Sequence, residues 1–179
     1  MKIFSFFKDL FKFDADSGIF RQIPLPVNRK LFASPMPFGA YDPGNRLLGI
    51  YKKNNINHVL MLVTTREVQK KAKKDLIRIY LSNNISYTQF EFIDLQAPDI
   101  KHLHALVLET HSLLQSKNVA VHCHAGVGRT GVAICAIVQH IKKCSSDEAY
   151  NYVREHMLIN MTDEQKRFVA KLRDTPLHN

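Results

Sequence analysis

Apolar runs of strand length alternate with helical patterns along most of the chain. Compact or alternating apolar runs predict strands at residues 31–34, 57–63, 87–92 and 118–122. Apolar positions at helical spacing predict helices at residues 47–54, 64–80, 100–114, 129–142, 147–156 and 163–173. Strands that alternate with helices and end in a helical tail predict an α/β fold: a central, largely parallel sheet of four to five strands flanked by helices.

Helix-capping residues precede several of these patterns. Thr64 stands three residues before Glu67, and Ser145 stands three residues before Glu148, which is the spacing of a capping box. Residues 21–45 are rich in Pro and Gly, and they predict extended chain and turns around the short strand at 31–34.

The N-terminus has a different pattern. Its apolar residues Ile3, Phe7, Leu10 and Phe11 fall on one helical face, and basic residues lie on the other side. We therefore divide the chain into an amphipathic segment, residues 1–20, and a single catalytic domain, residues 21–179. The apolar face of residues 1–13 either packs on the domain or docks on an anionic membrane or a partner. Charged residues interrupt this stretch, so it does not predict a signal peptide.

Composition narrows the class of protein without selecting a function. The chain has 179 residues, which suits one domain, and a formal net charge of +9, which favours anionic partners. Three cysteines do not form a disulfide framework, so we expect a reducing, cytoplasmic compartment. No apolar run approaches the roughly 18 residues of a membrane span. The four lysines at 70, 71, 73 and 74 predict a solvated helix face.

The stretch from Val119 to Gly131 carries the candidate chemistry. It runs from an apolar strand through a loop containing two glycines into a helix. Such a loop turns its N–H groups inward and forms an anion site at the helix N-terminus. Cys123 opens the loop, where these surroundings stabilise a nucleophilic thiolate.

Arg129 stands at the other end of this loop. Its planar fork is suited to holding two phosphoryl oxygens. Gly126 and Gly128 allow the backbone to approach a ligand closely, and Thr130 supplies a hydroxyl near the sulfur.

The segment His122 to Thr130 resembles the His-Cys-x5-Arg-Ser/Thr signature of the protein-tyrosine phosphatase superfamily. The short chain and the segment Leu31 to Pro37 are similar to the compact dual-specificity branch. This resemblance implies a cysteine-phosphatase fold, catalysis by Cys123 and Arg129, and no cofactor or metal. It also implies that the loop binds the substrate phosphate through His124, Ala125, Gly126, Val127, Gly128, Arg129 and Thr130.

The histidines on either side of Cys123 have other interpretations. His122 and His124 raise the alternative of a metal site, but no CxxC or HExxH motif accompanies them. We expect His122 to set the loop through hydrogen bonds. His124 lies either near the bound phosphate or in solvent.

The resemblance also implies a general acid about thirty residues before the cysteine. Asp94 lies 29 positions before Cys123, directly after a predicted strand, and is our candidate. Asp99 follows Pro98 and is predicted to cap the next helix, while Glu91 is predicted to be exposed on the strand.

Gln165 has two compatible interpretations. Gln165 lies where some relatives carry a glutamine that orients the hydrolytic water. It also forms a capping-box pattern with Thr162.

The sequence predicts an enzyme that hydrolyses phosphotyrosine, phosphoserine or phosphothreonine on proteins. Lipid-directed relatives often carry lysines inside the loop, whereas this chain has His124, Ala125 and Val127. The alternatives are a phosphoinositide or other non-protein phosphatase, including an RNA 5′-phosphatase, and a non-catalytic phosphate-binding module. We expect no nucleic-acid partner.

Overall fold

The computed structural model describes residues 18–171 and builds them around one five-stranded sheet. The strands are β1 (Arg21–Ile23), β2 (Leu31–Ser34), β3 (Ile56–Met61), β4 (Ser86–Gln89) and β5 (Asn118–His122). The helices are η1 (Pro43–Asn45), α2 (Leu47–Lys53), α3 (Thr65–Ala72), α4 (Leu76–Ser82), α5 (Ile100–Leu113), α6 (Arg129–Lys142), α7 (Ser146–His156) and α8 (Asp163–Lys171). The amphipathic pattern at residues 1–13 and the predicted helix end at Arg173 lie outside the described residues.

The sheet has the order β1-β2-β5-β3-β4. β5 pairs in parallel with both β2 and β3, and β4 pairs in parallel with β3. Only β1, at the edge, runs antiparallel to its neighbour. The central strand β5 is buried from Val119 to His122, as expected for a parallel strand covered on both faces. The prediction of a largely parallel sheet is confirmed.

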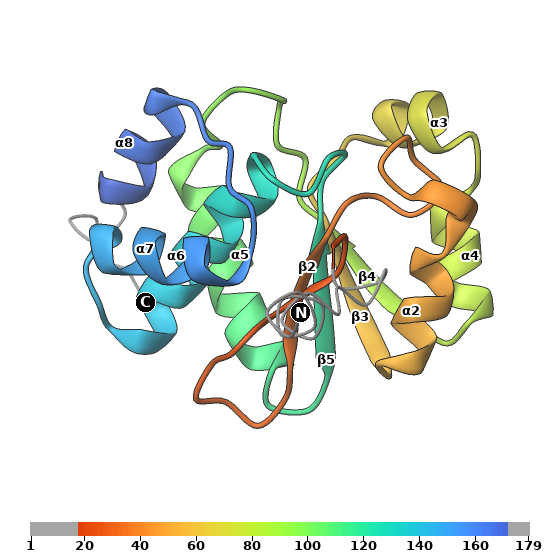
Figure 1. The fold of residues 1–179 in the computed structure, drawn as a ribbon, viewed down its shortest axis with the longest axis horizontal. Coiled ribbons are helices and arrows are strands. Elements are labelled where there is room, and N and C mark those ends of the chain that lie inside the picture. Colours follow the sequence, from red (N-terminus) through yellow and green to blue (C-terminus); the bar gives the residue numbers. More distant parts are fainter. Residues whose placement is uncertain (1–17, 172–179) are drawn as a thin grey trace, which may run out of the picture.

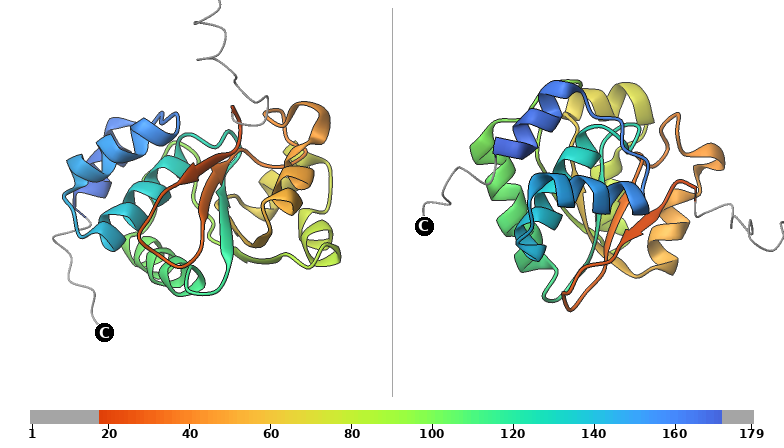
Figure 2. Two further views of the ribbon diagram at one scale, coloured as in Figure 1. Left: turned by 60° about the horizontal axis from the view of Figure 1, so that its bottom comes forward. Right: turned by 60° about the vertical axis from the view of Figure 1, so that its left-hand side comes forward.

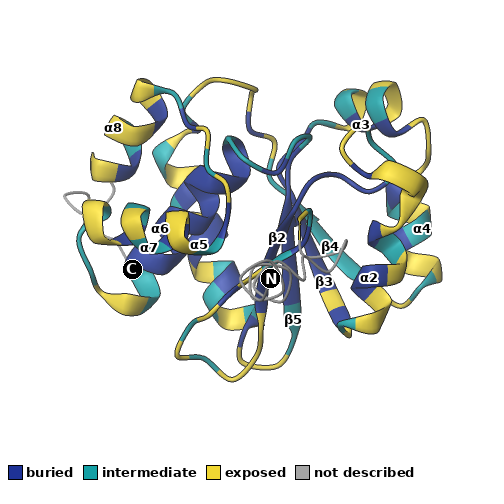
Figure 3. Cartoon of the chain, in the orientation of Figure 1, coloured by how far each residue is buried: buried dark blue, intermediate teal, exposed yellow. Residues whose placement is uncertain are grey.

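Helices cover both faces of the sheet (Figures 1 and 2). α2, α3 and α4 lie on one side, and α5 to α8 lie on the other. α6 is buried over most of its length because it packs on the sheet and against α5 and α7 (Figure 3). This burial fixes the N-terminus of α6 beside the end of β5.

Two predictions of element bounds need correction. The helix predicted for residues 64–80 is two helices, α3 and α4. The chain turns at Lys73, which has the left-handed φ of 53°, and Asp75 caps α4 by accepting a hydrogen bond from the Arg78 N–H. A continuous apolar period does not reveal this break, because the buried residues Val68, Ala72, Leu76 and Tyr80 keep a regular helical spacing across it.

The strand predictions also differ in part. The pattern at 87–92 predicts a longer strand than β4, which ends at Gln89. β1 was not predicted, because its three residues form no recognisable apolar run and pair only with the next strand.

The described residues contain no helix with the length and apolarity needed to cross a membrane.

Candidate active site

The loop between β5 and α6 lines a pocket at the carboxyl edge of the sheet. β5 ends at His122 and α6 begins at Arg129, so Cys123 and the five residues after it form the connection. The pocket has a volume of about 510 Å³. Its wall includes Cys123, His124, Ala125, Gly126, Val127, Gly128 and Arg129 from the loop, together with Ile19, Arg21, Tyr41, Asp94, Leu95, Met157 and Leu158.

Main-chain hydrogen bonds from two other loops hold this connection in place. The Met36 N–H donates to the carbonyl oxygen of His124, and the Asn160 N–H donates to that of Val127, each at 3.1 Å. Because these bonds use main-chain groups, the shape of the loop depends on the tertiary fold as well as on its own sequence.

Gly126 permits the sharp turn beneath the cysteine. Its φ is +81°, and a Cβ there would lie 2.6 Å from the Pro35 nitrogen and 2.7 Å from the Ser34 carbonyl carbon. No residue with a side chain fits that space without moving the backbone. The turn directs the Gly126 N–H to Cys123 Sγ at 3.3 Å, which is a contact that favours negative charge on the sulfur.

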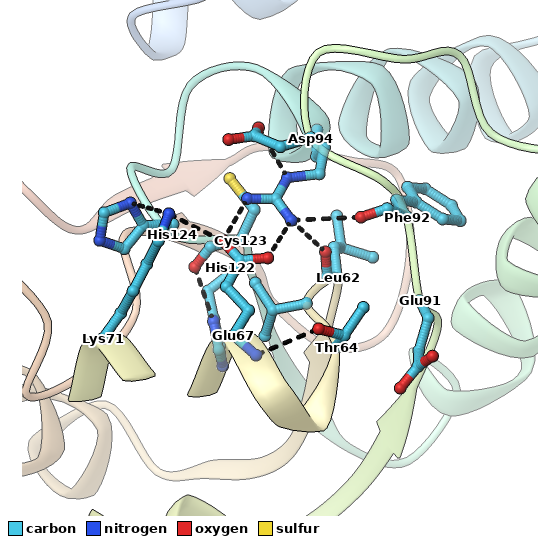
Figure 4. Close-up of polar contacts among 12 residues, drawn as sticks. Leu62, Thr64, Glu67, Lys71, Glu91, Phe92, Asp94, His122, Cys123 and His124 are labelled. Carbon is cyan, nitrogen blue, oxygen red and sulfur yellow. Dashed lines mark hydrogen bonds and ion pairs between the residues drawn. The ribbon is translucent and has the colours of Figure 1, made fainter. Parts of the chain in front are cut away.

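Arg129 is held by a bidentate ion pair with Glu67, which lies in the first turn of α3. Nη1 and Nη2 donate to the two carboxylate oxygens at 2.7 and 2.8 Å (Figure 4). The side chain of Arg129 is only 2% exposed. The Glu67 carboxylate occupies the end of the guanidinium fork and leaves the side formed by Nε and Nη2, which Asp94 Oδ1 approaches, to face the pocket.

The surroundings of Arg129 also fix its charge and orientation. Nη1 donates further hydrogen bonds to the main-chain oxygens of Leu62 and Phe92, both at 3.2 Å. Burial by itself lowers the pKa of Arg129, but the hydrogen bonds and charge of Glu67 outweigh it and raise the pKa. Burial likewise raises the pKa of Glu67, but Arg129 outweighs it, and the net pKa is lowered. The pair therefore stays ionised.

Of the three candidate carboxylates, the structure brings Asp94 to the site. Asp94 Oδ1 lies 3.2 Å from Arg129 Nε, on the open side of the fork, and the residue lines the pocket. Asp99 instead caps α5, accepting from the Lys101 and His102 N–H groups. That capping prediction is confirmed.

Glu91 was predicted to be exposed, and it is, although it lies beyond the end of β4. It does not line the pocket.

A tight turn presents Asp94 to the pocket. The Gln96 N–H donates to the Ile93 carbonyl at 3.3 Å, and Leu95 has a φ of 64°, which is uncommon for a residue with a side chain. Gln165 Nε2 donates to the Gln96 carbonyl at 3.1 Å and ties the turn to α8.

Gln165 also forms the predicted capping box. Its N–H donates to Thr162 Oγ1, and its Oε1 accepts from the Thr162 N–H. Gln165 is buried and is absent from the pocket wall, so in this structure it supports the turn that carries Asp94.

His122 holds the start of the loop through two hydrogen bonds. Its Nδ1 lies 3.0 Å from the Cys123 carbonyl oxygen, and its Nε2 lies 3.0 Å from the Tyr80 hydroxyl. The carbonyl can only accept, so Nδ1 carries the proton and Nε2 accepts from Tyr80. Burial lowers the pKa of His122 to about 4, which keeps the ring neutral. The expectation that His122 sets the loop through hydrogen bonds is confirmed.

His124 lies in the pocket wall, and its ring is half-buried. Its Nδ1 is 3.2 Å from Lys71 Nζ, and the edge of its ring meets Tyr41 at a centroid distance of 5.1 Å. Burial lowers its pKa, and the charge of Lys71 lowers it further. Lys71 also lies 3.2 Å from Glu67, so Lys71 and Glu67 together connect His124 to Arg129.

Of the residues expected to bind the substrate phosphate, Thr130 is the one that the structure does not place in the pocket wall. It is buried in the first turn of α6, and its Oγ1 has no hydrogen-bond partner among the described residues. The contact expected between this hydroxyl and the sulfur is therefore not formed in this structure.

Sequence reasoning missed Glu67, Lys71 and Tyr80 as parts of the site. Glu67 fits a capping box, and Thr64 does accept its N–H, but the Glu67 carboxylate is used by Arg129 instead. Lys71 belongs to a run of lysines that predicts a solvated face. Only the pairing of β3 with β5, Met61 opposite His122, brings α3 to the loop.

Within residues 18–171, no group of three or more His, Cys, Asp or Glu side chains is arranged to hold a metal ion.

Comparisons with known proteins agree with this geometry. The sequence model described as dual specificity phosphatase, catalytic domain, matches residues 43–175. The solved structure of kinase associated phosphatase, with its catalytic-site cysteine replaced by serine, is similar with a TM-score of 0.78 at 17% identity, over 88% of this chain and 95% of that one. PTPMT1 in complex with PI(5)P has a TM-score of 0.70 at 16% identity, over 87% of this chain and 94% of that one.

Curated relatives are similar over shorter stretches. Protein tyrosine phosphatase domain-containing protein 1 of Danio rerio is 30% identical over 76 residues, which is 42% of this chain and 11% of that protein. Tyrosine-protein phosphatase CDC14 of Candida albicans is 26% identical over 127 residues, 69% of this chain and 22% of that protein. The chain thus corresponds to a small part of the length of these relatives.

Proposed function

The chain belongs to the dual specificity phosphatase catalytic-domain family, and from that premise we propose that it is an active phosphatase that works through a cysteinyl-phosphate. One observation carries this proposal. The sulfur of Cys123, the open side of the Arg129 fork and the carboxylate of Asp94 meet in one pocket, although Asp94 is far from the other two in sequence.

In the first step the Cys123 thiolate attacks phosphorus. A sulfur–phosphorus bond forms as the bond to the leaving oxygen breaks, and protonated Asp94 gives its proton to that oxygen. The loop N–H groups and Arg129 bind the remaining phosphoryl oxygens, whose charge spreads in the transition state. Glu67 keeps the guanidinium in the orientation that this requires.

In the second step water replaces the sulfur. Asp94, now a carboxylate, takes a proton from the water as the oxygen attacks phosphorus, and the sulfur leaves as a thiolate. The products are inorganic phosphate and the original enzyme. Apart from the substrate and this water, both steps use only groups of this chain.

We propose phosphotyrosine and phosphoserine or phosphothreonine on proteins as the substrates. The half-buried loop residue His124 and the neutral Ala125 and Val127 stand where lysines would favour polyphosphorylated headgroups. The structural similarity to PTPMT1 bound to PI(5)P supports phosphoinositide as the second candidate.

The test is hydrolysis of p-nitrophenyl phosphate, a phosphopeptide panel and a phosphoinositide panel by the wild-type protein and Cys123→Ser. We expect turnover by the wild type, below about one per cent of it in Cys123→Ser, and retained binding of the phosphorylated ligand by the variant. A wild-type protein that binds but does not hydrolyse would identify a phosphate-binding module instead. The panel with the higher kcat/KM decides between protein and lipid substrates.

A further inference from the structure

The mouth of the pocket is surrounded by exposed apolar side chains. Six large hydrophobic residues of the described chain are exposed, and three of them line this one pocket. These are Tyr41, Leu95 and Leu158, which are 50%, 70% and 75% exposed. They come from three separate connections: the one between β2 and α2, the one between β4 and α5 that carries Asp94, and the one between α7 and α8.

Single exposed apolar residues are ordinary, but their gathering around one opening is not. Each of these three connections could carry a polar residue at the same position without loss of the core. Ile93, which is 62% exposed, is a second exposed apolar side chain of the turn that carries Asp94. An apolar rim around a phosphate site fits a partner that is anionic and apolar at once.

A basic helix stands at the same edge of the sheet. α3 begins after the end of β3, next to the end of β5, and its outer face carries exposed Arg66 and Lys70, with Lys73 and Lys74 exposed directly after it (Figure 3). Only Lys71 of the lysine run turns inward, toward Glu67 and His124. Lys71 thus joins α3 to the pocket wall through His124, and the exposed basic residues of the helix lie on the same element.

The chain also enters the described fold at this mouth. Gly18 and Ile19 line the pocket. In the sequence, the Phe-rich, Lys-containing residues 1–13 precede Gly18 by a few positions.

We propose that this face docks on an anionic phospholipid membrane. Tyr41, Leu95 and Leu158 would enter the boundary between headgroups and acyl chains, while the basic residues of α3 contact the headgroups and the pocket opens toward them. Apolar insertion combined with basic residues is the usual composition of an interfacial membrane site.

The experiment measures binding of the full-length protein to vesicles by sedimentation. Vesicles of phosphatidylcholine alone are compared with vesicles that contain about 30% phosphatidylglycerol. We expect binding only to the anionic vesicles, and we expect Leu95→Gln/Leu158→Gln to weaken it at least about tenfold. Arg66→Gln/Lys70→Gln should weaken it by a similar factor and abolish most of its salt dependence.

Two matched controls remove the same chemistry elsewhere. Leu81→Gln/Leu108→Gln changes two exposed leucines of α4 and α5, and Lys52→Gln/Lys53→Gln changes two exposed lysines at the far end of α2. Both should bind as the wild type does. Thermal melts of all variants identify any that fail to fold.

Absence of binding to anionic vesicles by the folded wild type would overturn the proposal, as would equal losses in the rim and control variants. If the rim variants bind vesicles normally but lose hydrolysis of phosphopeptides with apolar flanking residues, the rim serves a peptide instead. The proposal does not rest on turnover, because Cys123→Ser should bind the vesicles as well as the wild type does.

Discussion

Glu67 and Arg129 face each other in an end-on bidentate ion pair, with N–O distances of 2.7 and 2.8 Å, although 62 positions separate them in the sequence. The pair leaves one side of the guanidinium open toward the pocket. The first prediction is that Glu67→Gln lowers kcat by about ten- to a hundredfold, because a displaced guanidinium no longer matches the phosphoryl oxygens.

The same change should reduce stability. The variant leaves Arg129 buried with one neutral partner, which typically costs about 3–5 kcal/mol when the charge is fully uncompensated. Lys71→Gln is the control, since it removes the partly exposed contact of Glu67 with Lys71 and keeps the ion pair of Glu67 with Arg129.

The contribution of Glu67 to stability should also depend on pH. Because the pKa of Glu67 is lowered in the folded state, this contribution is present above the ordinary carboxyl pKa and is lost as the pH falls through the lowered value. Thermal unfolding across the acid range measures this loss, and equal melting curves for wild type and Glu67→Gln would contradict it.

The second prediction concerns the general acid. Asp94→Asn should lower the rate about 10²- to 10⁴-fold on substrates with poor leaving groups and flatten the alkaline limb of the pH–rate profile. Asp99→Asn is the matched control. It removes the α5 cap and should reduce the melting temperature with little loss of rate. The reverse pattern would show that the wrong carboxylate has been assigned.

The third prediction tests the turn under the sulfur. Gly126→Ala should abolish most activity and destabilise the protein by about 2 kcal/mol or more, because its Cβ would meet the main chain of Ser34 and Pro35 at under 3 Å. Gly49→Ala, where a Cβ meets nothing within 4 Å, should leave activity intact and stabilise α2 by up to about 1 kcal/mol. Activity and urea unfolding distinguish the two, and similar behaviour of both variants would refute the steric argument.

The fourth prediction follows from the buried histidine. The folded pKa of His122 is about 4, whereas the unfolded chain binds the proton with the ordinary pKa of 6.5. The neutral His122 ring therefore makes its full contribution to the free energy of unfolding above pH 6.5, and this contribution is lost as the pH falls toward 4. The loss amounts to about 3 kcal/mol at most.

His58, whose pKa is also lowered to about 4 by burial, adds a loss in the same direction. The free energy of unfolding should therefore be compared between wild type and His122→Asn from pH 8 to 4. The difference between their slopes isolates His122. Parallel curves would show that this ring does not stay neutral on folding.

The fifth prediction concerns oxidation. Cys123 lies in the open pocket and accepts the Gly126 N–H, so peroxide should modify it first and inactivate the enzyme reversibly. Burial raises the pKa of Cys135 to about 12, which keeps that thiol protonated and slow to react. Mass spectrometry of partially oxidised protein gives the order of modification. Earlier modification of Cys135 than of Cys123 would be inconsistent with the proposed site.

Local sequence determined much of this protein. The apolar runs of β3 and β5 predict strands because parallel strands buried on both faces need no polar alternation. The loop from Cys123 to Arg129 is also local: its glycines and the helix that follows define an anion site within a few residues. Asp99 as a helix cap was predictable for the same reason, since its partners are the next N–H groups along the chain.

Only the tertiary structure decided which distant side chains complete the site. Glu67 has the spacing of a capping residue, and nothing within α3 shows that its carboxylate binds Arg129 rather than its own helix N-terminus. The pairing of β3 with β5 sets that choice, because it brings the start of α3 to the end of the loop. Lys71 and Tyr80 reach the two histidines for the same reason. Short-range spacing encodes helices, caps and the anion loop, whereas contacts across the sheet depend on strand order and register, which no local pattern specifies.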